Sequence, residues 1–219
     1  MMEPMMPSWD QAVASPEQQR ELKRRAILRV ASRLFNEKGF HGTSLDEIAD
    51  VLGVTKTALY YYVKSKDALL YECMALSYRC GGRAREYAEA QARDPREGIC
   101  MFYGRFVELL VTERGAYTTM ANVNALPEER RTELLERRRG LSRYLRTQLK
   151  EAAERGLIRP VDPRITANFL LGAANWVLRW YAEDDKQSPA EIAAVFVDLL
   201  LNGIAAGNPV VLPPFPDQT

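Results

Sequence analysis

Residues 43–62 read TSLDEIADVLGVTKTALYYY, and this stretch predicts two short helices that meet at a tight turn. Ser44 and Glu47 have the three-residue spacing of a capping box, which begins a helix. Positions i, i+3, i+4 and i+7 then give that helix one internal face, formed by Leu45, Ile48, Ala49 and Leu52. Gly53 follows at once and tolerates the positive φ of a helix end. A second apolar pattern starts with Val54, Ala58 and Leu59. The stretch therefore predicts a helix-turn-helix.

The second of these helices and its flanks have the side chains of a DNA-contacting surface. Hydroxyls and phenols reach base edges from the start of a helix, and lysines just beyond it contact phosphates. We expect DNA contacts from Thr43, Ser44, Thr55, Lys56, Thr57, Tyr60, Tyr61, Lys64 and Lys66. Acidic Asp46 argues against base contacts from the first helix. The alternative, a solvated corner of an ordinary bundle, does not account for the capping pattern, the Ala49 to Gly53 spacing and the basic flank together.

The segment from Ala26 to Leu70 resembles the N-terminal domain of TetR-family transcriptional regulators, over roughly a fifth of the chain. The resemblance is carried by Ile27, Ala31, Leu34, Phe35, Gly39, Thr43, Ile48, Ala49, Gly53, Val54, Leu59, Tyr60, Tyr62, Lys64, Ser65, Lys66 and Leu69. It implies a DNA-binding head, a helical ligand-binding body and a homodimer. It also implies that the helix after the head moves with ligand state and sets the separation of the two recognition helices.

The distribution of charge agrees with a DNA-binding head. Residues 20–66 contain ten Lys and Arg against five Asp and Glu, although the whole chain has a net charge of only +1. A basic head on a mildly acidic remainder is expected where one end of a protein meets a polyanion.

Composition excludes several other classes of protein. With 219 residues, 47% apolar and 27% charged, the chain has ordinary globular composition. Its longest apolar stretches, 169–178 and 192–201, are shorter than the roughly 20 residues that span a bilayer. The Met-rich start lacks the pattern of a signal peptide, so we expect a cytoplasmic protein without a membrane partner.

The few potential catalytic and metal-binding residues argue against an enzyme. His41 is the only histidine, which rules out a multi-His metal site and confines any Ser-His-Asp triad to the loop beside the helix-turn-helix. Cys73, Cys80 and Cys100 lack C-x-x-C spacing and are expected to be reduced. Cys73 and Cys80 permit a thiol sensor, but buried packing is the favoured interpretation. We expect no cofactor and no catalytic activity.

The whole chain is expected to be all-α, with a three-helix head and a helical body. The expected parts are a mobile arm at 1–18, a helix-turn-helix domain at 19–66, a ligand-binding and dimerisation domain at 67–206 and a Pro-rich tail at 207–219. Helices are expected near 16–38, 65–92, 95–113, 127–155, 162–181 and 189–206. The arginine-rich helix 127–155 is interpreted as a solvated face with i,i+4 ion pairs, and a second nucleic-acid patch is its alternative.

The last two expected helices are apolar nearly all round. A helix of this kind needs burial on two sides, one by its own domain and one by a partner. We therefore expect a homodimer that joins through a four-helix bundle, as the resemblance also implies.

Aromatic residues in the body suggest a small-molecule pocket, although the same residues suit a core. The expected ligand contacts are Phe102, Phe106, Tyr144, Asn175 and Trp176. The segment 170–181, with its Asp-Pro and Ser-Pro flanks, is similar to the branch of the family that responds to acyl-CoA thioesters. Such a ligand needs cations at the pocket mouth, for which Arg105, Arg143 and Arg179 are candidates.

These features together predict a ligand-responsive repressor. We expect a dimer that binds a palindromic double-stranded operator, with half-sites about 34 Å apart, and that a small-molecule effector releases. The alternative is a helical dimeric interaction protein, or an acyl-CoA-binding protein, that binds DNA only nonspecifically.

Overall fold

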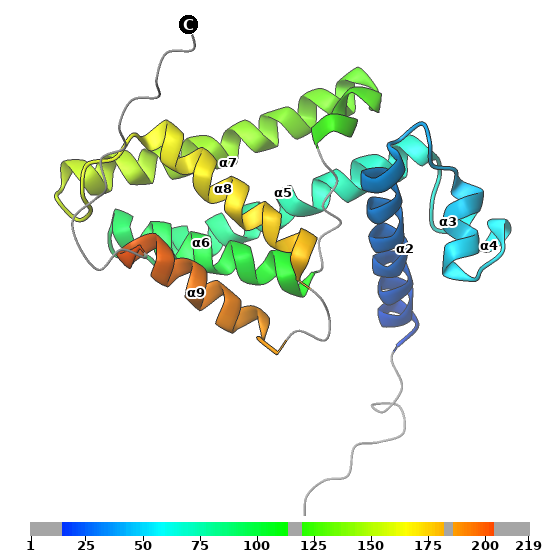
Figure 1. Cartoon of the computed structure of the whole chain (residues 1–219), viewed down its shortest axis with the longest axis horizontal. Coiled ribbons are helices and arrows are strands. Elements are labelled where there is room, and N and C mark those ends of the chain that lie inside the picture. The colour runs from blue at the N-terminus through cyan, green and yellow to red at the C-terminus, as the bar shows by residue number, and fades with distance from the viewer. Residues whose placement is uncertain (1–14, 114–119, 182–185, 204–219) are drawn as a thin grey trace, which may run out of the picture.

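The computed structural model describes residues 15–113, 120–181 and 186–203, and these form a helical head and a helical body (Figure 1). The described residues contain no strand, which confirms the all-α prediction. The elements are α2 (Pro16–Lys38), α3 (Leu45–Leu52), α4 (Lys56–Tyr60), α5 (Lys66–Gln91), α6 (Pro95–Thr112), η1 (Met120–Ala125), α7 (Glu128–Glu154), α8 (Pro163–Trp180) and α9 (Pro189–Asn202). No helix in the described part of the chain is long and apolar enough to cross a membrane.

Capping residues set the starts of most helices where the sequence predicts them. Ser65, Asp94, Asp162 and Ser188 each accept a backbone N–H from the first turn of the helix that follows. Ser15 caps α2 in the same way, so the helix includes residues 16–18 of the expected arm. The rest of that arm and the expected tail at 207–219 lie outside the described residues.

The head consists of α2, α3 and α4 packed around the start of α5. Ile48, Ala49 and Leu59 are buried, and Gly53 has the left-handed φ of +66° that the sequence predicts. The predicted capping box forms only in part. Ser44 Oγ accepts Glu47 N–H at 3.0 Å, but the Glu47 carboxylate pairs with Lys38 instead of returning to the cap. That hydrogen bond lowers the pKa of Glu47.

The predicted apolar pattern of the second motif helix is wrong at two of its three positions. Val54 and Ala58 are exposed, whereas Leu59 is 1% exposed. Because α4 has only five residues, one buried leucine and the Thr55 cap hold it in place. The other residues of α4 are exposed to solvent and can contact a partner.

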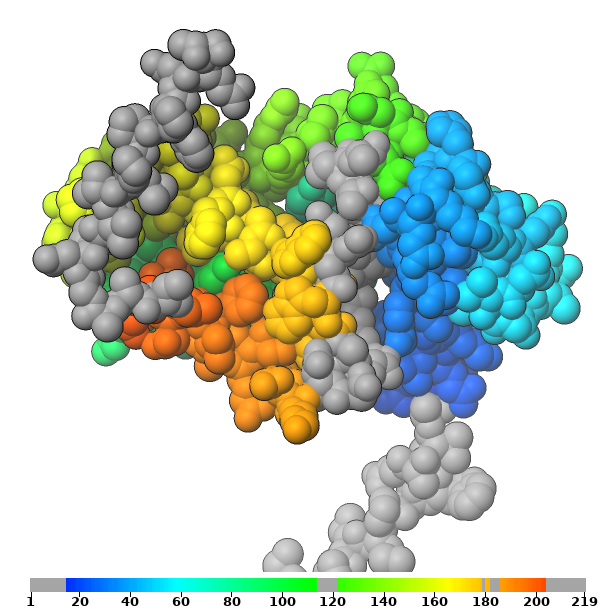
Figure 2. All heavy atoms as spheres, in the orientation of Figure 1, coloured from blue at the N-terminus to red at the C-terminus, as the bar shows by residue number. Residues whose placement is uncertain are grey.

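In the body, α6 is the central helix and packs against α5, α7, α8 and α9. Phe102, Phe106, Val107 and Leu110 on α6 are all buried. The apolar line expected on α7, from Leu134 to Ala152, is also buried. Helices α8 and α9 each bury one side against α6 and leave the other side exposed, as Figure 2 shows for the yellow and orange elements.

The connection from α6 to α7 holds the head at two points. Glu113 pairs with Arg25 of α2 at 3.3 Å and with Arg83 of α5 at 2.7 Å. Asn122 in η1 is 8% exposed; its Oδ1 accepts Phe40 N–H and its Nδ2 donates to Phe35 O, both at 3.1 Å. The side-chain amide thus bridges two backbone groups of the head.

We predict that Asn122→Ala lowers the free energy of unfolding by about 1–3 kcal/mol, because the part-buried Phe40 N–H and the buried Phe35 C=O lose their side-chain partner. Denaturant unfolding measures this loss, and hydrogen exchange at the Phe40 amide localises it. Asn124→Ala, an exposed asparagine on the same turn, is the matched control and should change neither. Equal stability of the two variants would contradict the bridging role.

Candidate functional site

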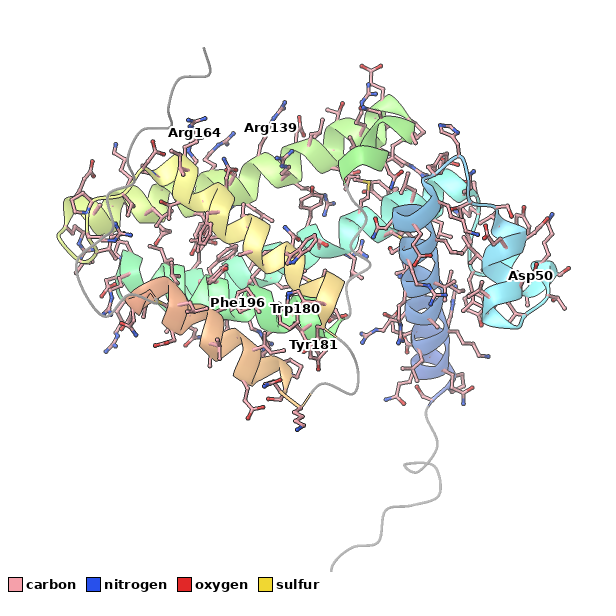
Figure 3. All side chains as sticks on the ribbon, viewed as in Figure 1. Asp50, Arg139, Arg164, Trp180, Tyr181 and Phe196 are labelled. Atoms are coloured by element: carbon pink, nitrogen blue, oxygen red, sulfur yellow. The ribbon has the colours of Figure 1, made fainter. Side chains whose placement is uncertain are left out.

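The far end of the head presents α4 and the loop before α3 to solvent. Thr55, Lys56, Thr57, Tyr60 and Lys64 are exposed, as is Tyr61 at 72%. These residues and Ser44, which is also exposed, are accessible to DNA. The surface therefore combines hydroxyl, phenol and ammonium groups. It also includes a carboxylate, that of Asp50 on α3, which Figure 3 labels on this part of the head.

An ion pair crosses the hollow between α3 and α4. Lys56 Nζ lies 2.8 Å from an Asp46 carboxylate oxygen and 6.0 Å from the centre of the Tyr60 ring. The hydrogen bond to Asp46 raises the pKa of Lys56. Lys56 is therefore paired with Asp46 in the unbound head, and a contact with DNA would have to replace or share that partner.

Thr43 and Lys66 do not present their polar groups to solvent as predicted. Thr43 is 2% exposed, and its hydroxyl donates to Gly39 O at 3.0 Å. The Lys66 ammonium donates to Phe40 O and Thr43 O, both at 2.9 Å, and lies 4.3 Å from the centre of the Phe40 ring. Two of its three donors are thus used to close the 39–43 loop. Lys66 therefore has a structural role in the unbound head, which leaves one donor for the predicted phosphate contact.

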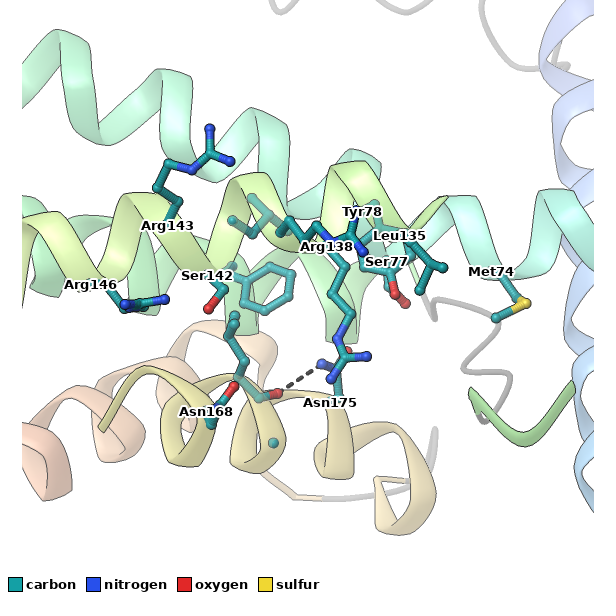
Figure 4. Close-up of a pocket in the computed structure, with 15 residues that line it drawn as sticks. Met74, Ser77, Tyr78, Leu135, Arg138, Ser142, Arg143, Arg146, Asn168 and Asn175 are labelled. Atoms are coloured by element: carbon teal, nitrogen blue, oxygen red, sulfur yellow. Dashed lines mark hydrogen bonds between the residues drawn. The ribbon is translucent and has the colours of Figure 1, made fainter. Parts of the chain in front are cut away.

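The body contains a cavity of about 730 Å³ between α5, α7 and α8, with one wall from α6 (Figure 4). Its lining residues are Met74, Ser77 and Tyr78 of α5, Phe106 of α6, Leu135, Arg138, Arg139, Leu141, Ser142, Arg143 and Arg146 of α7, and Asn168, Leu171, Gly172 and Asn175 of α8. In Figure 4 Met74 and Arg146 lie at opposite ends of the cavity.

Two of the five predicted ligand residues line this cavity. Phe106 and Asn175 do so, and Asn175 Nδ2 also donates to Leu171 O at 2.8 Å. Phe102 and Tyr144 are instead packed in the core, where their ring centres are 5.3 Å apart. Trp176 directly follows Asn175, and successive residues of a helix point about 100° apart. It therefore lies on the outer side of α8, where it is 59% exposed. The predictions for these three residues are not supported.

The cavity wall is cationic, and Arg143 is the one arginine in it that the sequence predicts. Four arginines of α7 line it, and no Asp or Glu is among the described residues that do. Arg143 was an expected cation; Arg105 instead pairs with Glu108 at 2.7 Å, and the side chain of Arg179 lies outside the described residues. A signal was present, since cations at 139, 143, 146 and 150 recur at i, i+4, i+7 and i+11 along one helical side.

The cysteines are packing residues. Cys73 and Cys80 are buried, and burial raises the pKa of the Cys80 thiol to about 11. A thiol with such a pKa is almost wholly protonated at neutral pH and reacts poorly. The thiol-sensor alternative therefore finds no support, and the described residues contain no cluster of three or more His, Cys, Asp or Glu that could hold a metal.

We predict different effects for Lys64 and Lys66, the two lysines that follow α4. Lys64→Ala should leave stability unchanged and reduce the slope of log K against log salt for duplex DNA by about 0.9, because one phosphate contact is lost. Lys66→Ala should lower the midpoint of thermal unfolding, because two loop carbonyls lose their donor. Wild-type stability together with a reduced slope in Lys66→Ala would return Lys66 to the phosphate-contacting set.

Comparison with known proteins places this arrangement in a family. Residues 27–73 match "Bacterial regulatory proteins, tetR family", and residues 92–204 match "Tetracyclin repressor-like, C-terminal domain". The transcriptional regulator RutR of Escherichia coli K12 is 53% identical over 47 residues, which are 22% of either chain. The match thus spans about a fifth of the length of that relative.

Two solved structures are similar over most of this chain. The TetR-family regulator PfmR from Thermus thermophilus is 32% identical with a TM-score of 0.65, and the match covers 82% of this chain and 98% of PfmR. AibR in complex with isovaleryl coenzyme A and operator DNA is 28% identical with a TM-score of 0.60, over 83% and 98% of the two chains. Both family matches and the coverage of PfmR lead to one conclusion: the chain belongs to the tetR family of bacterial regulatory proteins.

Proposed function

We propose that this protein is a dimeric transcriptional repressor of the cytoplasm, a regulator and not an enzyme. Its head binds a palindromic operator, and an anionic effector of the acyl-CoA class releases it by binding in the body cavity. The observation that carries the proposal is the helix-turn-helix whose second helix is almost wholly exposed on a basic head. We further propose that residues 19–66 and 67–206 are its DNA-binding and effector-binding domains.

Support for DNA binding comes from the accessible residues of the head. Thr57 and Tyr60 lie on the exposed part of α4, where side chains reach base edges if the helix enters a major groove. Lys64 follows the helix at the position expected of a phosphate contact. Ser44, Thr55, Lys56 and Tyr61 complete the proposed DNA-contacting set, from which Thr43 and Lys66 are now left out.

Support for a dimer comes from the outer sides of α8 and α9. Phe169 is 70% exposed, Trp176 59% and Val195 54%, and the exposed set also includes Ile165, Trp180, Leu199 and Leu201. Both helices lie on the face turned to the viewer in Figure 2, and each packs on α6. Large apolar groups exposed on one face of the molecule indicate an interface with another protein. We propose that two copies join these faces as a four-helix bundle.

Support for an anionic effector comes from the composition of the cavity. Arginines line one side of it, and Phe106, Leu141 and Leu171 supply apolar surface. These arginines form no salt bridge with a carboxylate of the described residues, and guanidinium groups favour carboxylate or phosphate ligands. The AibR structure, with its isovaleryl coenzyme A, shows that a protein of similar fold accepts an acyl-CoA. A short acyl-CoA is therefore the proposed effector class.

Release from DNA requires that the effector bind the DNA-free arrangement more tightly than the DNA-bound one. Helix α5 supplies a physical route for this coupling. Met74 lines the cavity and is also packed in the core of the head, and Tyr78 contacts both cores. A ligand that displaces either side chain acts on the helix that carries the head.

We predict that Phe169→Glu converts the dimer to a monomer in sedimentation velocity experiments, because a charge replaces an apolar contact at the centre of the proposed interface. Tyr87→Glu, at an exposed aromatic residue of α5, is the control and should remain dimeric. A dimeric Phe169→Glu protein would exclude this face as the interface.

We also predict specific binding to DNA upstream of the protein's own gene in mobility shifts with excess competitor, and release by one member of a panel of acyl-CoAs at fixed salt. Binding that no thioester reverses would retain the repressor and discard the effector class. Failure to bind any specific site would contradict the repressor and favour the helical interaction protein.

A further inference from the structure

A second hollow lies outside the cavity, where the later part of α7 passes the start of α8. It measures about 570 Å³ and is lined by Arg143, Arg146, Thr147, Lys150, Asp162, Pro163 and Arg164. Arg143 and Arg146 line this groove and the cavity alike. The two hollows therefore share two wall residues, while Lys150 and Arg164 line only the groove.

The cations of this groove come from two helices. Arg143, Arg146 and Lys150 of the groove follow one side of α7 over about 10 Å, given the rise of 1.5 Å per residue, and Arg139 of the cavity precedes them on the same side. Arg164 belongs to the first turn of α8 and meets Arg143, Arg146 and Lys150 in the groove lining. In Figure 3 Arg139 and Arg164 lie along the same edge of the body. An extended anion could thus contact cations along its length and from two sides.

Among the described residues that line the groove, four cations face one carboxylate, that of Asp162. Asp162 caps α8 by accepting Ile165 N–H at 2.8 Å; that hydrogen bond, and the nearby charges of Arg164 and Arg146, lower its pKa. Lys150 lies 3.7 Å from Glu154, on the same helix. Arg143, Arg146 and Arg164 form no salt bridge with any residue that the structure describes, whereas Arg137 on α7 pairs with Glu133 at 2.7 Å.

We propose that this groove binds the phosphate groups of the effector and selects phosphorylated ligands, while the acyl end of the same molecule lies in the cavity. Several guanidinium groups around one hollow match the charge and geometry of phosphates better than those of a single carboxylate. The proposal rests on the proposed function, because it names which part of the effector each hollow holds. In this proposal the arginines of α7 bind phosphate groups and do not serve only as a solvated face.

The test compares two ligands that differ only in the phosphorylated part. Isothermal titration calorimetry of the full chain would measure the affinity for isovaleryl-CoA and for S-isovaleryl pantetheine, which has the same acyl end and no phosphate. Lys150→Ala/Arg164→Ala removes two groove cations that do not line the cavity. Arg96→Ala/Lys186→Ala removes the same charge from exposed positions elsewhere and is the matched control.

We expect the wild-type protein to bind the CoA ester more tightly than the pantetheine ester. The groove variant should lose about tenfold or more in affinity for the CoA ester, since charged hydrogen bonds are lost, and nothing for the pantetheine ester. The control should match the wild type with both ligands. Any one of four results would overturn the proposal. The wild type could bind the two esters equally or bind neither. The groove variant could lose equal affinity for both esters or lose none.

A mobility shift without effector separates this proposal from the repressor function. The groove variant should bind operator DNA as the wild type does. A variant that loses operator binding without effector would identify the groove as a nucleic-acid patch and overturn the phosphate proposal. If the wild type itself binds no operator, the repressor function fails, and the two-ester titration still decides what the groove binds.

Discussion

Helix α5 contributes buried side chains to two hydrophobic cores, and the position of the head depends on this shared helix. Its first turns place Leu69, Leu70 and Met74 in the core of the head, and its later turns place Cys80, Ala84 and Ala88 in the core of the body. The head and the body therefore share α5, and no single position in the chain divides their two cores. Asn122 and Glu113 add polar contacts from the α6–α7 connection to α2 and the loop after it. A change in the body that moves α5 or η1 must also act on the head.

The sequence predicts the helices well because contacts within a few residues determine where each helix begins and ends. Ser, Asp and Pro at the helix starts, and Gly53 in the turn, each satisfy a backbone requirement that is visible within a few residues. The side-chain roles depend on contacts across many residues and were predicted less well. Lys66 reaches the carbonyls of Phe40 and Thr43, more than twenty positions earlier, and local spacing does not reveal that contact. Trp176 and Asn175 are neighbours in sequence, yet only packing on α6 decides which of them faces the cavity.

Cations gather in two regions of the molecule, for which we propose different tasks. The head offers exposed lysine, hydroxyl and phenol groups to a polymer of phosphates, and the body gathers arginines of α7 around a cavity and a groove. The arginines were interpreted from sequence as a solvated face, since glutamates are close along the chain. The structure shows that such pairing is selective: Arg137 has a carboxylate partner at 2.7 Å, whereas Arg143 and Arg146 line the hollows without one among the described residues. Only the fold distinguishes these two kinds of arginine.

If effector and operator compete through α5 and its contacts, thermodynamic linkage makes their binding mutually weaker. The measurement is the affinity for isovaleryl-CoA by titration calorimetry, with the protein free and with the protein saturated by its operator. We expect operator DNA to weaken effector binding by the same factor as the effector weakens operator binding, typically about 5- to 150-fold. Equal effector affinity with and without operator would rule out this competition, because a ligand that binds both states alike releases nothing.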